Sequence, residues 1–187
     1  MPTNHRAGRR LAAFAAGALT LFAPVLALAQ GGSKSPAAAK ELTTVLDRLK
    51  LEAIAAPDPA DPGTFVAALY FQGGQLLVVS AKYSAPTLLV AKLAKKDYRD
   101  VYIDLNAASV AGSKIFVMDQ TCDGLVAKPG DGAADTWEQG TTTTVFDGEW
   151  KKAKMSEEEY VKAFTGADDR YARILTLLAE QAKKSGS

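Results

Sequence analysis

The sequence predicts an α+β domain with a largely antiparallel sheet. Three observations predict it: an amphipathic helical segment that follows Pro36, two apolar runs separated by "QGGQ", and a capping-box sequence before a long helical segment near the C-terminus. The elements follow one another as helix, strands, short helix, strands and helix. Helices and strands that are segregated in this way are typical of an α+β domain.

The first 29 residues have the three-part layout of a secretory signal peptide: basic residues, an apolar run, and Ala27-Leu28-Ala29 as a cleavage site. An uncleaved membrane anchor is the alternative, because the apolar run approaches the ~20 residues that span a bilayer. Gly17 and Pro24 interrupt the run and favour cleavage after Ala29. We therefore expect a periplasmic or secreted protein, and Arg9-Arg10 leaves a twin-arginine route open beside the general one.

Cleavage also removes the only histidine, His5, and leaves a nearly neutral chain. We expect no nucleic-acid partner, because no basic cluster is dense enough, and no membrane partner after signal cleavage. Without histidine, Ser-His-Asp and Cys-His catalysis and histidine-ligated zinc are excluded. Cys122 is the single cysteine, so an intramolecular disulfide is excluded as well.

After a flexible leader at residues 30–35, we expect a single domain over residues 36–184. Its first element is a helix whose apolar side chains recur at helical spacing, which puts one stripe on the core. The stripe consists of Ala39, Leu42, Val45, Leu46, Leu49 and Ala53. Three prolines and a glycine in "PDPADPG" exclude a regular helix over Pro57–Gly63 and predict a loop.

Phe65–Phe71 and Leu76–Ala81 are rich in aromatic and β-branched residues, and the glycines between them favour a tight turn. The pattern predicts a hairpin. Both runs are almost continuously apolar. This indicates either strands covered on both faces or a closed barrel whose outer face is packed by helices.

A short helix follows, because Ser84 can cap it and Pro86 is tolerated in its first turn. Val101–Leu105 and Lys114–Met118 are the next predicted strands. From Asp119 to Gly140 the pattern weakens, and we expect a loop with one short strand at Leu125-Val126.

The last elements are a hairpin and a helix. Thr141–Phe146 and Glu149–Lys151 flank Asp147-Gly148, a strong hairpin signal. Ser156 and Glu159 form a capping-box pattern that predicts the start of the C-terminal helix.

Three stretches together resemble the split β-barrels of the pyridoxamine-phosphate-oxidase and flavin-reductase-like group. They are "LEAIAAPDPADPGTFVAALYF", "QLLVVSAKYSAP" and "LAKKDYRDVYIDL". The resemblance covers about residues 51–118 and is one of pattern. It implies a split antiparallel β-barrel with an N-terminal helix, a short helix between strands and a C-terminal helix. It also implies a homodimer that binds flavin mononucleotide (FMN) at its interface.

The resemblance implies a cofactor site at the step after the second hairpin strand. The residues that match it are Lys82, Tyr83, Ser84, Thr87 and Lys92. The family carries a serine followed by Arg-Lys at this step to hold the cofactor phosphate, whereas this chain has Ser84-Ala85-Pro86-Thr87. Ser84, Thr87 and the helix amino end could supply some of the hydrogen bonds that a phosphate needs.

Three further features have both a structural and a functional interpretation. "DQTCDG" resembles the first half of a calcium loop, but Thr121 and Gly130 stand where ligands belong, so we predict a turn and no metal. Cys122 next to Asp123 is predicted to be an inert thiol. Trp137 and Trp150 beside a Thr-rich strand form either a carbohydrate-stacking or partner surface, or part of the core.

The expected function is an exported protein that binds a small ligand, with FMN as the candidate cofactor and catalysis of the oxidase or reductase type unproven. The alternative is a non-catalytic binding or interaction module of the cell envelope that uses the barrel as a scaffold. The apolar runs "FVAALYF" and "QLLVVSA" offer more apolar surface than two helices cover, so we expect a homodimer held by these strands.

Overall fold

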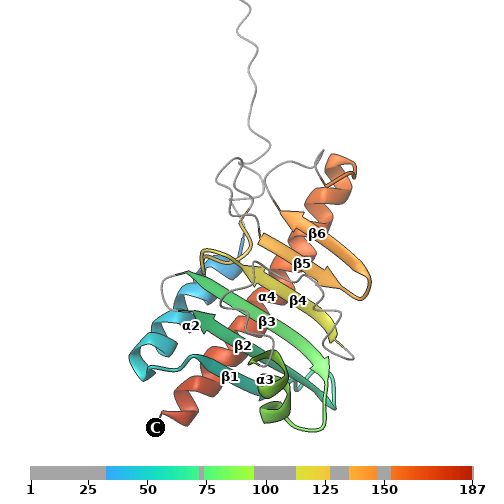
Figure 1. The fold of residues 1–187 in the computed structure, drawn as a ribbon. Helices are drawn as coiled ribbons and strands as arrows, with labels where there is room; N and C mark the ends of the chain where they lie inside the picture. Colours follow the sequence, from blue (N-terminus) through green and yellow to red (C-terminus); the bar gives the residue numbers. More distant parts are fainter. Residues whose placement is uncertain (1–32, 72–73, 95–112, 127–134, 147–152, 187) are drawn as a thin grey trace, which may run out of the picture.

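The computed structural model describes residues 33–71, 74–94, 113–126, 135–146 and 153–186 (Figure 1). They form one six-stranded sheet in which the strands follow one another in sequence order. The strands are β1 (Ala53–Pro57), β2 (Thr64–Phe71), β3 (Gln75–Lys82), β4 (Ser113–Asp119), β5 (Asp135–Gln139) and β6 (Thr142–Phe146). The helices are α2 (Ser35–Leu49), α3 (Pro86–Ala94) and α4 (Glu157–Ser185). The predicted α+β class and antiparallel sheet are confirmed.

The sheet is an open meander. Every neighbouring pair of strands is antiparallel, and β1 and β6 lie at opposite ends of the strand order. The predicted closure of the sheet into a split barrel is therefore not confirmed. Helices cover both faces of the sheet, so its apolar side chains are buried without closure.

The two faces of the sheet pack against different helices, with α2 and α4 on one face and α3 on the other (Figure 1). Alternate residues of β3 explain the arrangement, because successive side chains of a strand point to opposite faces. Leu76 and Val78 belong to the core cluster under α2 and α4, whereas Leu77 and Val79 belong to the cluster under α3.

The predicted hairpin is confirmed, and the predicted first helix is confirmed over Ser35–Leu49. Ala53, which the prediction places in the helical stripe, instead begins β1, because Lys50 ends α2 in a left-handed conformation. In α2 the buried residues include Ala39, Leu42 and Val45, as the helical spacing requires. The hairpin of β2 and β3 places Ala67 opposite Val79 and Leu69 opposite Leu77. Nearly every side chain in the two strands is buried, which explains the continuous apolar runs.

The region after β4 differs from the prediction. Leu125-Val126 is not a strand, and the fifth strand is instead β5, which lies in the segment that the sequence predicts to be a loop. β6 pairs with β5 through a turn at Gly140 and Thr141. The predicted strands Val101–Leu105 and Glu149–Lys151 lie outside the described residues, as does the predicted signal peptide.

The C-terminal helix begins as predicted. The Ser156 hydroxyl accepts from the Glu159 backbone N–H, and the Glu159 carboxylate accepts from the Ser156 backbone N–H, which completes a capping box. α4 then runs without interruption through Gly166 and crosses the sheet (Figure 1). Among the residues described, no helix has the length and apolar character needed to span a membrane.

Candidate ligand-binding groove

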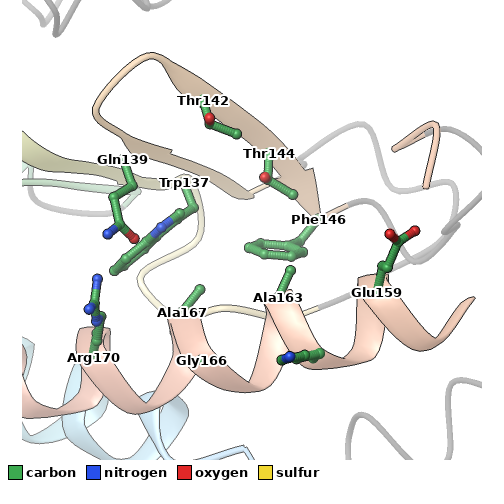
Figure 2. Close-up of a pocket in the computed structure, with 11 residues that line it drawn as sticks. Trp137, Gln139, Thr142, Thr144, Phe146, Glu159, Ala163, Gly166, Ala167 and Arg170 are labelled. Atoms are coloured by element: carbon green, nitrogen blue, oxygen red, sulfur yellow. The ribbon is translucent and has the colours of Figure 1, made fainter. Parts of the chain in front are cut away.

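A groove of about 690 Å³ lies between the β5–β6 hairpin and the first half of α4 (Figure 2). Eleven residues line it, and all come from these three elements. They are Trp137, Gln139, Thr142, Thr144, Phe146, Glu159, Lys162, Ala163, Gly166, Ala167 and Arg170. Its volume lies within the roughly 300–1,000 Å³ typical of small-molecule sites.

Small residues of α4 keep the groove open. Ala163, Gly166 and Ala167 are spaced three and four residues apart, so they share the helix face that looks toward the hairpin (Figure 2). A Cβ atom built at Gly166 would meet no heavy atom within 4 Å. The space opposite the hairpin is therefore unfilled at this point of the helix.

The hairpin supplies the aromatic wall. Strand register pairs Trp137 with Thr144 and Gln139 with Thr142, so these four side chains share one face of the hairpin. Trp137 and Phe146 point from that face toward α4 (Figure 2). Phe146 packs edge-to-face on Phe164 at a centroid distance of 5.0 Å, which fixes one end of the wall.

Charged groups stand at the rim. Glu159 lies near Phe146 at one end, and Arg170 lies below Trp137 and Gln139 at the other (Figure 2). The Glu159 carboxylate accepts from the Ser156 hydroxyl at 2.7 Å, and the pKa of Glu159 is lowered, first by the bond from the Ser156 backbone. In the described part of the chain, Lys162 and Arg170 have no acidic partner within 4.0 Å.

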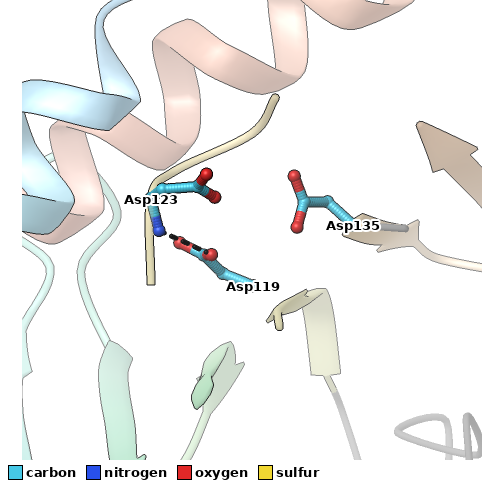
Figure 3. A group of neighbouring side chains, drawn as sticks. All are labelled: Asp119, Asp123 and Asp135. Carbon is cyan, nitrogen blue, oxygen red and sulfur yellow. Dashed lines mark hydrogen bonds between the residues drawn. The ribbon is translucent and has the colours of Figure 1, made fainter. Parts of the chain in front are cut away.

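A second group of polar side chains lies at the turn after β4. Asp119, Asp123 and Asp135 each offer one carboxylate oxygen, and these oxygens lie within 4.8 Å of one another (Figure 3). Burial raises the pKa of Asp119 to about 7. Burial and the neighbouring Asp119 charge raise the pKa of Asp135 to about 8. These two carboxyl groups therefore hold protons close to neutral pH.

Hydrogen bonds explain this acidic group as part of a turn. Asp119 accepts from the backbone N–H of Asp123 at 3.0 Å and of Gly124 at 2.8 Å, and from the Tyr171 hydroxyl at 3.2 Å. Asp135 accepts from the backbone N–H of Val126 at 2.8 Å. The three carboxylates are of the type that holds Ca²⁺ or Mg²⁺, but a cation would have to replace the protons and the donors already present.

The thiol of Cys122 lies beside the same group. Burial, followed by the charges of Asp119 and Asp123, raises the pKa of Cys122 to about 12. A thiolate is the reactive form of cysteine, so this environment supports the predicted inert role.

The five residues predicted to hold a flavin lie elsewhere in the fold, at the step from β3 to α3. The Lys82 ammonium lies 3.7 Å from the Asp61 carboxylate, and Tyr83 packs partly buried against the core cluster under α3. Ser84 and Thr87 are exposed at the amino end of α3, and Lys92 lies within that helix. None of the five lines the groove beside α4.

Sequence reasoning singled out Trp137 but missed the groove. The Thr-rich strand beside Trp137 is the sequence signal for a binding surface, whereas the sequence predicts a loop where β5 lies. The opposite wall depends on Gly166 and Arg170, which are far from Trp137 in sequence. Only the packing of α4 across the hairpin brings the two walls together. Comparisons of the chain with protein-family models, with curated proteins and with solved structures find no match.

Proposed function

We propose that this protein binds a small organic ligand in the groove between the β5–β6 hairpin and α4. The observation that carries the proposal is an unfilled groove with an aromatic wall, opposite a helix face of small residues. Small-molecule sites are typically concave and mostly apolar, with a few polar groups that fix orientation. Trp137 and the small residues of α4 supply the apolar surface, with Phe146 buried behind it, while Gln139, Thr142 and Arg170 supply the polar groups.

The glycine in the middle of α4 supports this proposal. Glycine inside a helix costs roughly 0.5–1 kcal/mol relative to alanine, and Gly166 has room for a larger side chain. Filling the groove would increase apolar contact and improve helix propensity. The chain instead forgoes this stability where a ligand would sit.

Blocking the groove tests the proposal. N-phenyl-1-naphthylamine, a neutral fluorophore that brightens in apolar sites, is titrated into the wild type and the Gly166→Leu variant. The wild type should bind one equivalent, and Gly166→Leu should lose binding because leucine fills the space beside Trp137. Thr165→Leu is the matched control, since Thr165 is an exposed neighbour on α4 that does not line the groove. Equal binding by Gly166→Leu and the wild type would contradict the proposal.

FMN binding at the step from β3 to α3 is the second candidate. It is supported by the exposure of Ser84 and Thr87 at the amino end of α3, where backbone N–H groups favour a phosphate. Lys82 is close in sequence and half exposed. Protein mixed with FMN and then desalted should keep the flavin absorbance. Loss of all absorbance at high FMN concentration would exclude this candidate.

We also propose that the protein is exported. The support is the three-part layout of residues 1–29 with its small-residue site at Ala27-Leu28-Ala29. Expression of the full chain in a bacterium followed by N-terminal sequencing of the periplasmic fraction should give Gln30 as the first residue. A full-length chain recovered from the membrane fraction would favour the uncleaved anchor instead.

A further inference from the structure

We infer that the ligand of the groove is an amphipathic organic anion, with an apolar body between Trp137 and the small residues of α4 and a carboxylate or phosphate group at the Arg170 end. This inference rests on the proposed function and names the class of ligand for the same site. Three features of the groove carry it: the balance of charge at the rim, the arrangement of donors at one end, and the size of the space.

The balance of charge favours an anion. Lys162 and Arg170 are both exposed at the rim, and no carboxylate of the described residues pairs with either of them. Glu159 is the one acidic side chain among the lining residues, and it is bound by the backbone and the hydroxyl of Ser156. The groove therefore presents two cations without an acidic partner against one carboxylate, and this excess of positive charge attracts a negatively charged ligand.

The donors gather at one end of the groove. Gln139 on β5 and Arg170 on α4 point toward one another across that end (Figure 2). Thr142 stands opposite Gln139 in the hairpin register, so its hydroxyl belongs to the same end. A guanidinium binds a carboxylate or phosphate through two parallel N–H donors, and the amide and the hydroxyl each add a donor. This combination of donors suits an oxyanion better than a neutral group.

The rest of the groove suits an apolar body of limited size. Between the two ends, the lining side chains are Trp137 and Thr144 on the hairpin and small residues on α4. Aromatic side chains favour flat apolar partners through stacked or edge-to-face contact. A space of about 690 Å³ holds a drug-sized molecule, so the occupant is a small molecule.

Two fluorophores that differ by a single charged group test this inference. 8-Anilinonaphthalene-1-sulfonate carries the same rings as N-phenyl-1-naphthylamine and adds one sulfonate. The sulfonated probe should bind the wild type about tenfold more tightly, because one charge-assisted hydrogen bond is worth roughly this factor. Arg170→Gln should remove that advantage, because it should lower the affinity for the sulfonated probe about tenfold more than the affinity for the neutral probe. Arg48→Gln, which removes an exposed arginine of α2 outside the groove, is the matched control and should keep the advantage.

The outcomes separate this inference from the proposed function. If Gly166→Leu blocks both probes but the sulfonate gives no advantage, the anionic class is wrong and ligand binding in the groove stands. If the sulfonated probe still binds more tightly than the neutral probe in Arg170→Gln, the anionic group does not bind at the Arg170 end and the inference is wrong. If neither probe binds in a manner that Gly166→Leu abolishes, both the proposed function and the inference fail. Near-ultraviolet circular dichroism of each variant confirms that the probes report on a folded protein.

Discussion

At the scale of single residues, two buried side chains hold the turn after β4, those of Asp119 and Ser35. Asp119 binds the backbone of the turn and the hydroxyl of Tyr171 in α4. Gly124 sits directly against the start of α2, near Ser35 and Pro36. Leu125 donates its backbone N–H to the Ser35 hydroxyl at 2.7 Å. The turn therefore joins the sheet to both helices on one face.

Stability should decrease as the pH rises through neutrality. The pKa values of Asp119 and Asp135 are about 7 and about 8, against an ordinary value near 3.8. Between the ordinary and the raised pKa, the folded state binds more protons than the unfolded state. The free energy of unfolding therefore falls with pH, by at most about 1.4 kcal/mol per unit for each group. Urea denaturation at pH 5 and pH 8.5 measures the decrease.

The Asp135→Asn variant isolates one of the two carboxyls. It should flatten the pH dependence between about pH 5 and 8, whatever its effect on stability at one pH. Asp58 acts in the opposite direction, because the bond from Arg173 lowers its pKa and its contribution is lost as the solution becomes acidic. The two effects together place maximum stability near the ordinary carboxyl pKa, at about pH 4. If the unfolding free energy of Asp135→Asn changes with pH as steeply as that of the wild type, Asp135 does not cause the pH dependence.

Gly124→Ala should destabilise the protein much more than Gly140→Ala. Both glycines have positive φ, +79° and +64°, so each substitution carries the strain of a left-handed residue. A Cβ atom at Gly124 would also collide with the backbone of Ser35 and Pro36, whereas one at Gly140 would meet nothing within 4 Å. We expect a loss of about 1 kcal/mol for Gly140→Ala and about 2–4 kcal/mol for Gly124→Ala. Chemical denaturation of both variants measures the difference, and equal losses would show that α2 yields to the added methyl group.

At the scale of elements, α4 connects the other parts of the fold. Asp168 of α4 accepts hydrogen bonds from Ser33, Lys34 and Ser35 at the amino end of α2. Arg173 binds the nearly buried Asp58 of the β1–β2 loop through two N–H groups, both at 2.8 Å. The same helix forms one wall of the groove. One element thus fixes a helix, a loop and the candidate site.

Asp168→Ala should cost about 2 kcal/mol or more of unfolding free energy. It removes the acceptor of four hydrogen bonds and leaves the first N–H groups of α2 without a cap. Asp169→Ala is the matched control, because Asp169 makes only an exposed ion pair with Lys34, worth about 0–1 kcal/mol. Thermal unfolding of both variants compares them. Similar losses would mean that Asp168 does not cap α2.

Sequence patterns predicted the elements whose burial is regular. The helical stripe of α2, the apolar β2–β3 hairpin and the capping box at Ser156 were all found, because each depends on local spacing. β5 was missed because its sequence, DTWEQ, mixes a tryptophan with acidic and polar residues that are nevertheless mostly buried. Asp135 is buried because Val126 donates to it, and a contact of that kind leaves no periodic signal. The groove was not predictable because its two walls come from separate elements.

At the scale of the whole molecule, one chain covers both faces of its sheet. The strands that we expected to hold a dimer are buried already: Leu77 and Val79 are 2% and 0% exposed and pack in one cluster with Leu89 and Leu93 of α3. The described part of β2 and β3 therefore offers little apolar surface to a second copy. The homodimer stays a prediction, and light scattering at micromolar concentration decides it.

Leu77→Lys should unfold the domain rather than separate two subunits. A lysine at this position would place an unpaired charge in the core beneath α3, which is among the most destabilising kinds of substitution. Leu88→Lys is the control, because Leu88 of α3 is 51% exposed. Circular dichroism and light scattering follow folding and mass together. A folded, monomeric Leu77→Lys protein from a dimeric wild type would show instead that Leu77 lies at an interface.

The packing of α2 against α4 also constrains how the nascent chain folds. α2 is the first described element to leave the ribosome and α4 is the last, yet they share one core over the same face of the sheet. While the strands are being translated, that face has no α4 to cover it. Domains generally fold as units, so the protein should acquire protease resistance only after α4 has been synthesised. Until then the side chains that later form the core lack their cover, so the incomplete chain should be a substrate for chaperones.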